Sequence, residues 1–354
     1  MKNKLRIFGV LNHLGNNYEM LKLAQTYPVK FSYLLNNVRK WNRHAPRPRP
    51  ETWLNDDQFE WVTHYEKGKY DLAILHVDQQ HTDPNMGKGW LYTDLNEIIT
   101  DIPKIVINHG TPMWDEFYTE DMVVNGGIVH TPKGPRKLIG MKEKMGNNFM
   151  VVNSYEAVDR WGWGYPLIHG LDPKEWWDLP KEPRVTISVS PGGLDKYYNR
   201  TLMTYIKTSV KEKTGLDVYH IGVNYVPADW DDYRQFIGRS LIYINPTLDS
   251  PMPRARSEAM LSGCLVLTSR YHGAGDFIKH GVEGFIIPDN PNSYAETCEQ
   301  LIYYHYGEAV EMGQRGKEKA IKLFDKSRYQ KDLYYIITEI LEGRKPEWDK
   351  QKIW

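Results

Sequence analysis

The chain alternates short apolar runs with helical patterns, and it does so in two consecutive series. Strands separated by helices are typical of parallel α/β sheets, because a parallel connection has to cross back over one face of the sheet. In the first series the pattern predicts helices at Tyr18–Thr26 and Asp94–Thr100, and a proline-rich loop at Arg43–Pro50. The expected strands of that series are Leu5–Val10, Lys30–Leu35, Asp71–Val77, Lys104–Asn108, Phe149–Val152 and Pro166–Ile168.

The second series begins after Leu171–Pro183, a stretch with three prolines that reads as a linker. The expected strands are Val185–Val189, Asp217–Ile221, Leu241–Asn245, Leu265–Thr268 and Gly284–Ile287. The expected helices are Arg200–Lys211, Asp231–Gly238, Arg254–Ser262, a short one near Gly275–Lys279, and those from Pro291 onward. The fold class predicted is therefore α/β, with two Rossmann-like domains facing each other across a cleft. Ligands of such sheets bind beyond the carboxyl ends of the strands.

Length and composition agree with two ordinary domains. The 354 residues suffice for two domains of roughly 150 residues each. We expect a first domain at 1–172, a second domain at 173–325, and a helix at 326–354 that crosses back to the first domain. A formal net charge of zero argues against stable nucleic-acid binding. With two cysteines and no apolar run of membrane-spanning length, we expect a reducing, cytoplasmic setting and at most peripheral membrane contact.

The most specific stretch is Ile244–Pro288, where a strand, a proline-rich turn and a helix follow one another. A helix amino end offers free backbone N–H groups and partial positive charge, which suits a diphosphate. Glu258 lies one turn into this helix, where its carboxylate could accept both hydroxyls of a ribose, and Arg254 and Arg256 could neutralise phosphate charge. The alternative from spacing alone is a surface glutamate with solvated arginine neighbours.

This stretch resembles the donor-site signature of glycosyltransferase family 4, the retaining enzymes of the GT-B fold. Glu258-Ala259-Met260 matches the family's second acidic motif, and by that analogy Glu258 holds the nucleotide ribose. The neighbouring matches are Pro246-Thr247, Gly263-Cys264-Leu265-Val266, and His280-Gly281-Val282-Glu283-Gly284-Phe285 with Pro288.

Three further segments extend the resemblance over nearly the whole chain. Ile107-Asn108-His109-Gly110 resembles the strand-end histidine that lies near the sugar and acceptor in many members. Gly15, followed by Glu19, Leu23 and Ala24, resembles the first glycine-rich loop, where the backbone approaches the ligand closely. The junction between domains is matched by Asn153-Ser154 and by Ile168-His169-Gly170-Leu171-Asp172 with Trp176.

Two positions depart from the family pattern. The first glutamate of the acidic pair, which contacts the donor sugar, is replaced by Ser250, with Asp249 beside it as a substitute. Lys196 fits the lysine that grips the diphosphate, but Pro191 stands in the place of its arginine partner. Arg200 and Arg254 are the candidate replacements. The segment of Met252, Pro253 and Arg254 is expected beside the same phosphate site, with backbone N–H groups near it as further donors.

The resemblance implies transfer of a sugar from a UDP- or GDP-linked donor to a hydroxyl acceptor, with retention at the anomeric carbon and no cofactor. Asp231 and Asp232 are adjacent on a probable helix and are not spaced as in the Asp-x-Asp motif of metal-dependent glycosyltransferases, so we expect no essential metal. His109, Asp249 and Ser250 are the predicted catalytic group.

The acceptor side is predicted from a polar loop after the third strand and from an aromatic residue. His81 and Asp83 are spaced as in some metal sites, but contact with acceptor hydroxyls is favoured, and Trp114 is placed with them. The basic residues of Arg39–Arg49 are either a solvated face or a surface for an anionic acceptor. Two rival functions stay open: a nucleotide-sugar epimerase of the same architecture, and a degenerate protein that binds nucleotide sugars without transfer.

Overall fold

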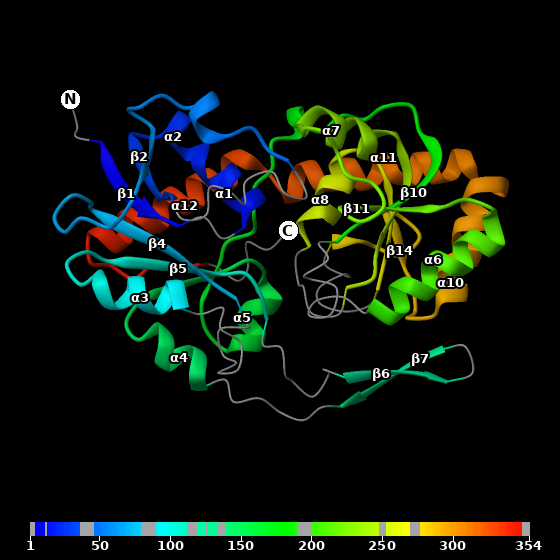
Figure 1. Ribbon diagram of the computed structural model, residues 1–354, viewed down its shortest axis with the longest axis horizontal. Coiled ribbons are helices and arrows are strands. Elements are labelled where there is room, and N and C mark those ends of the chain that lie inside the picture. The colour runs from blue at the N-terminus through cyan, green and yellow to red at the C-terminus, as the bar shows by residue number, and fades with distance from the viewer. Residues whose placement is uncertain are drawn as a thin grey trace.

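The computed structural model describes residues 4–10, 13–35, 46–78, 90–111, 119–124, 127–132, 139–189, 200–247, 253–269 and 277–348. Two parallel sheets lie side by side, one in each half of the molecule (Figure 1). The first has seven strands in the order β3-β2-β1-β4-β5-β8-β9, and the second has five in the order β11-β10-β12-β13-β14. The predicted fold class, two Rossmann-like α/β domains, is confirmed.

The first sheet is apolar because both of its faces are covered. Successive residues of β1, such as Ile7 and Phe8, enter different core clusters on the two faces, and both are fully buried. The strands are β1 (Leu5–Gly9), β2 (Val29–Leu34), β3 (Phe59–Val62), β4 (Leu72–Val77), β5 (Lys104–Asn108), β8 (Phe149–Val152) and β9 (Tyr165–Pro166). The helices are α1 (Leu14–Leu21), α2 (Leu23–Thr26), α3 (Trp90–Ile98), α4 (Ile139–Met145) and α5 (Tyr155–Trp161).

Three features of this half differ from the sequence-based expectation. The helix expected at Tyr18–Thr26 starts four residues earlier, at Leu14, and is interrupted at Lys22. Strand β3 was not expected, since it is an edge strand in which only Phe59 is buried and the other three residues are half-buried. An antiparallel hairpin, β6 (Thr119–Val124) and β7 (Gly127–Pro132), was also not expected.

The second sheet follows the predicted order closely. Its strands are β10 (Glu182–Ser188), β11 (Val218–Ile221), β12 (Ser240–Asn245), β13 (Leu265–Thr268) and β14 (Gly284–Ile286). The helices are α6 (Arg200–Thr214), α7 (Trp230–Arg239), α8 (Arg254–Leu261), α10 (Pro291–Glu299), a π-helical turn at Gln300–Tyr304, and α11 (Tyr306–Leu323). Of the short helix expected near Gly275–Lys279, residues 275 and 276 lie outside the described residues.

The chain crosses between the two halves twice, and the crossings lie together. The first follows Leu171 into a 3₁₀ turn at Pro173–Glu175, and the second leads into α12 (Lys326–Leu341). Leu171 pairs with Asp325, and Lys326 donates to Asp172 at 2.6 Å. A side chain at Gly170 would clash with Tyr329, so glycine allows this close approach.

Helix α12 packs on the first sheet, so the predicted return of the C-terminal helix is confirmed (Figure 1). Tyr329, Leu333, Ile336 and Ile337 are buried in the same core cluster as Ile7. Within the part of the chain that the structure describes, the helices are too short or too polar to cross a lipid bilayer.

Candidate functional site

The amino end of α8 meets the amino end of α1 where the two halves face each other. Arg254, the first residue of α8, donates from Nη1 to Asn16 Oδ1 at 3.0 Å and from Nη2 to Glu19 Oε1 at 3.1 Å. A Cβ at Gly15 would lie 2.5 Å from Arg254 Nε, so glycine is needed here for close approach to the protein's own arginine. Helix α8 therefore begins at the interface between the halves, with buried Pro253 as its N-cap residue.

The carboxylate of Glu258 is buried and bonded on both oxygens. Its Oε1 accepts from Arg47 Nη2 at 2.5 Å and from Arg254 Nε at 2.9 Å, and its Oε2 accepts from Tyr233 OH at 2.7 Å. Only 2% of Glu258 is exposed. Burial acts to raise the pKa of Glu258, but the charges of Arg47 and Arg254 outweigh it and leave the pKa below its usual value. Glu258 is therefore an anion held inside the protein.

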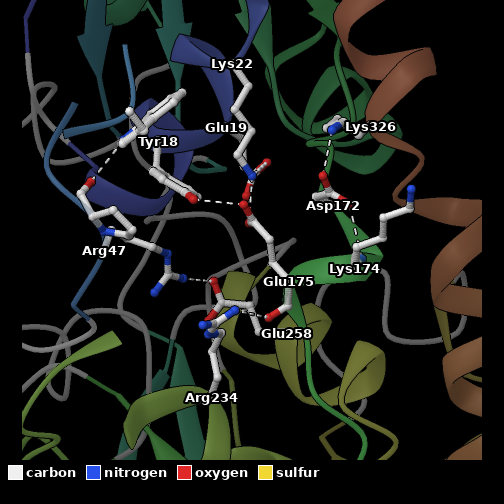
Figure 2. A network of polar contacts seen from close by, with 12 residues as sticks. Tyr18, Glu19, Lys22, Arg47, Asp172, Lys174, Glu175, Arg234, Glu258 and Lys326 are labelled. Carbon is white, nitrogen blue, oxygen red and sulfur yellow. Dashed lines mark hydrogen bonds and ion pairs between the residues drawn. The ribbon is translucent and has the colours of Figure 1, made fainter. Parts of the chain in front are cut away.

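Arg47 reaches this carboxylate from the proline-rich segment of the other half. Its guanidinium carbon lies 4.1 Å from the ring centroid of Trp230 and 5.4 Å from those of Trp176 and Tyr233. Figure 2 shows Arg47 pointing across to Glu258. An arginine over an indole face gains cation–π attraction, which adds to the ion pair.

Two of the sequence-based alternatives are wrong at this site. The expected solvated face at Arg39–Arg49 does not hold for Arg47, which is 2% exposed, whereas its neighbour Arg49 has 49% of its side chain exposed. The surface alternative for Glu258 and Arg256 fails as well, since both are buried. The local sequence carried no signal for Arg47, because its partner lies 211 residues away along the chain.

A second network of buried charges links α1 and α2 to the first crossing (Figure 2). Lys22 donates to Glu19 at 2.9 Å and to Glu175 at 2.7 Å, and Tyr18 OH donates to Glu175 at 2.8 Å. Glu19 also accepts a hydrogen bond from Arg254, so this network continues into the Glu258 cluster. Sequence reasoning assigned none of these contacts to Lys22 or Glu175.

His109 lies directly after strand β5, facing the amino end of α1. Its Nδ1 is 3.0 Å from Asn16 Nδ2, and its Nε2 is 2.8 Å from His76 Nδ1. Arginine has only donors, so Arg254 fixes Asn16 Oδ1 as its acceptor and leaves the amide N–H groups for His109. Neutral His109 then accepts at Nδ1 and donates from Nε2 to His76. A hydrogen-bonded chain thus runs from Arg254 through Asn16 and His109 to His76.

A small cavity of about 30 Å³ adjoins this chain. It is lined by residues of both crossings and of the first sheet, among them Asn16, His76, His109, His169 and Tyr329. That volume is enough for one or two water molecules. His109 thus lies beside a small space between the first sheet, α1 and α12.

Burial of His76 and of His169 predicts how the free energy of unfolding depends on pH. The pKa of His76 is lowered to about 3 by its burial and by the neighbouring His13. An unfolded histidine titrates near 6.5, so between these values only the unfolded chain binds the proton. The stability from neutral His76 is complete above about pH 6.5 and is lost as the pH falls toward 3.

Acidification from pH 7.5 to 5 is therefore expected to cost about 2 kcal/mol through His76 alone. Burial and nearby arginines also lower the pKa of His169, which adds to the effect. Urea unfolding at several pH values measures this, and His76→Asn should flatten the slope. His64→Ala, at an exposed histidine, should leave it unchanged. Equal slopes in the parent protein and His76→Asn would contradict the assignment.

The remaining predicted site residues are placed only in part. Arg200 is exposed at the first position of α6. Lys196, Asp249, Ser250 and Met252 on the donor side, and His81, Asp83 and Trp114 on the acceptor side, lie outside the described residues. Within the described ranges, three or more His, Cys, Asp or Glu side chains do not gather into a metal-binding group.

A comparison with known protein families finds a match in the second half of the chain. Residues 204–303, which contain α8, match the family model described as glycosyl transferases group 1. No curated protein matches in sequence.

Solved structures match over almost the whole chain. HepE from Anabaena, in complex with UDP and glucose, aligns at a TM-score of 0.60 and 13% identity, covering 95% of this chain and 100% of HepE. Sucrose-phosphate synthase from Thermosynechococcus elongatus aligns at 0.63 and 12%, covering 96% and 100%. The pneumococcal O-GlcNAc transferase GtfA, in complex with UDP and GlcNAc, aligns at 0.58 and 11%, covering 96% and 99%. At these identities the likeness establishes the fold, and that fold is the two-domain GT-B architecture of glycosyltransferases.

Proposed function

We propose that this protein is a retaining glycosyltransferase that moves a sugar from a nucleoside diphosphate donor, UDP- or GDP-linked, to a hydroxyl acceptor. The observation that carries the proposal is a set of hydrogen bonds between the two halves. Arg254 and Glu258 lie at the amino end of α8, and Arg254 is connected through Asn16 to His109, which follows a strand of the first sheet. The family model that matches this segment and the nucleotide-bound structures of the same fold support it.

The proposed chemistry uses cations and dipoles rather than a metal or cofactor. As the donor bond breaks, the leaving diphosphate gains negative charge, which Arg254, Lys196 and the free N–H groups of α8 would stabilise. The sugar becomes oxocarbenium-like, as in glycoside hydrolysis. His109, with Asp249 or Ser250, would orient the sugar, and closure of the two halves would exclude water.

We propose that residues 173–325 bind the donor and residues 1–172 the acceptor. The acceptor class is a glycan, a lipid-linked sugar or another polymer with free hydroxyls. Arg39, Lys40 and Arg43, earlier in the same basic segment, favour an anionic acceptor. We place the reaction in the cytoplasm, with at most peripheral membrane contact.

The test begins with a thermal-shift screen of UDP, GDP and their sugars. A ligand at about 100 times its Kd adds about 2.7 kcal/mol to stability, which gives a clear shift. The stabilising donor is then incubated with and without acceptor sugars, and products are followed by NMR. Acceptor-dependent release of nucleotide with an unchanged anomeric configuration supports the proposal. Epimerised donor favours the epimerase, and binding without turnover across the acceptor panel favours a degenerate binding protein.

A further inference from the structure

The carboxylate proposed to hold the ribose has no room for it in this structure. A carboxylate can accept about four hydrogen bonds. Glu258 already accepts one each from Arg47, Arg254 and Tyr233. Two ribose hydroxyls need two positions, and only 2% of Glu258 is exposed. At least one of the present partners has to leave before a nucleotide can bind there.

Arg47 is the partner whose departure costs the cluster least. It comes from the first half of the chain, whereas Tyr233 and Arg254 belong to α7 and α8 beside Glu258. If Arg47 leaves, Glu258 keeps Arg254 as a cationic partner, which it shares with Glu19. The ion pair of Lys22 with Glu175 does not involve Arg47, so it keeps joining the two halves.

The groups around the Arg47 guanidinium have the chemistry of a nucleoside pocket. Trp230 offers its face at 4.1 Å, and Tyr233 stacks beside Trp230 with a centroid distance of 5.9 Å. Trp176 meets Trp230 edge-on, and its indole N–H is buried without a hydrogen-bond partner among the described residues. A flat base with carbonyl acceptors, attached to a sugar with two hydroxyl donors, satisfies the indole face, the N–H and the carboxylate together.

We infer that Trp176, Trp230, Tyr233 and Glu258 form the nucleoside-binding pocket, and that Arg47 fills it in the ligand-free protein and is displaced by the donor. This inference rests on the proposed function, since it names where the donor's nucleoside binds. The displaced guanidinium frees the proline-rich segment from the second half. Donor binding is thereby coupled to a change in the contact between the halves.

The experiment measures UDP and GDP binding by isothermal titration calorimetry to the full chain. Because an internal occupant lowers the fraction of binding-competent protein, Arg47→Ala is expected to bind at least about tenfold more tightly than the parent. Arg47→Met, which keeps the bulk of the side chain, guards against misfolding of the alanine variant and should also bind more tightly. Arg49→Ala is the matched control, an exposed arginine on the same segment, and should bind as the parent does.

The location of the pocket is tested in the Arg47→Ala background. Adding Trp230→Ala should weaken binding by about tenfold or more, because it removes the stacking face. An unchanged nucleotide affinity after Trp230→Ala would exclude Trp230 from the pocket.

The outcomes separate the two proposals. Measurable binding that is equal in the parent and Arg47→Ala, or weaker in Arg47→Ala, overturns the inference and leaves the glycosyltransferase proposal standing. Tighter binding in Arg47→Ala supports both. Failure of the parent and of both Arg47 variants to bind either nucleotide overturns the proposed function, and the inference with it.

Discussion

Replacing Glu258 by alanine is expected to lower the free energy of unfolding by about 3–5 kcal/mol and to abolish binding of nucleoside diphosphates. The stability loss follows because Arg47 and Tyr233 each lose a partner in a buried site. The binding loss follows because Glu258 is the proposed acceptor for the ribose hydroxyls. Urea unfolding measures the first effect, and calorimetric titration of UDP and GDP measures the second.

Two matched variants separate the structural role of Glu258 from its binding role. The double variant Arg47→Leu with Glu258→Leu replaces the ion pair by apolar side chains and should regain most of the stability, but not the binding. Tyr233→Phe removes one hydrogen bond and should cost about 1 kcal/mol. A loss of less than 1 kcal/mol in Glu258→Ala would show that the pair is not buried in solution, and unchanged nucleotide affinity would remove Glu258 from the ribose site.

Replacing His109 by alanine is expected to lower kcat for sugar transfer by about 10²–10³-fold while leaving the Kd for UDP or GDP within about twofold. The reason is its proposed position: His109 follows β5 and is connected to Arg254 through Asn16, so we expect it to face the sugar rather than the nucleotide. Single-turnover transfer assays and calorimetric titration measure the two quantities separately.

The controls use the other histidines of the first half. His64→Ala changes an exposed side chain and should leave kcat unchanged. His76→Asn keeps an acceptor for His109 Nε2 and acts as a change in a positioning residue, so kcat should fall less than in His109→Ala. A fall in nucleotide affinity that parallels the fall in kcat would contradict the assignment of His109 to the sugar.

The fold could be predicted where local patterns and burial agree. Strands β5, β8 and β13 have the predicted limits, and α8 begins at the predicted residue, Arg254, after a proline that ends the preceding turn. These segments are continuous apolar runs or have clear start signals, which any buried parallel strand or helix requires. Strand β3 is a partly exposed edge strand, and its mixed residues carry no such run.

Several of the predicted site residues meet where the two halves face each other. Gly15 lies in the first turn of α1, His109 directly after β5, and Arg254 and Glu258 in α8. The alternating pattern had located the end of β5 and the start of α8. The exact partners of these residues were not predictable. Gly15 approaches Arg254, and Asn16 connects that arginine to His109, because two helix ends from different halves come together.

By itself, the sequence determined the two parallel sheets, their order along the chain, and the helix that presents Arg254 and Glu258, because periodic burial and turn residues act over a few neighbours. The tertiary structure alone decided the partners of Glu258. Arg47 is 211 residues away from it and sits in a segment of alternating prolines and arginines that reads as a surface loop. Only the packing of the two halves removes that arginine from water, and burial makes its ion pair with Glu258 strong enough to occupy the site.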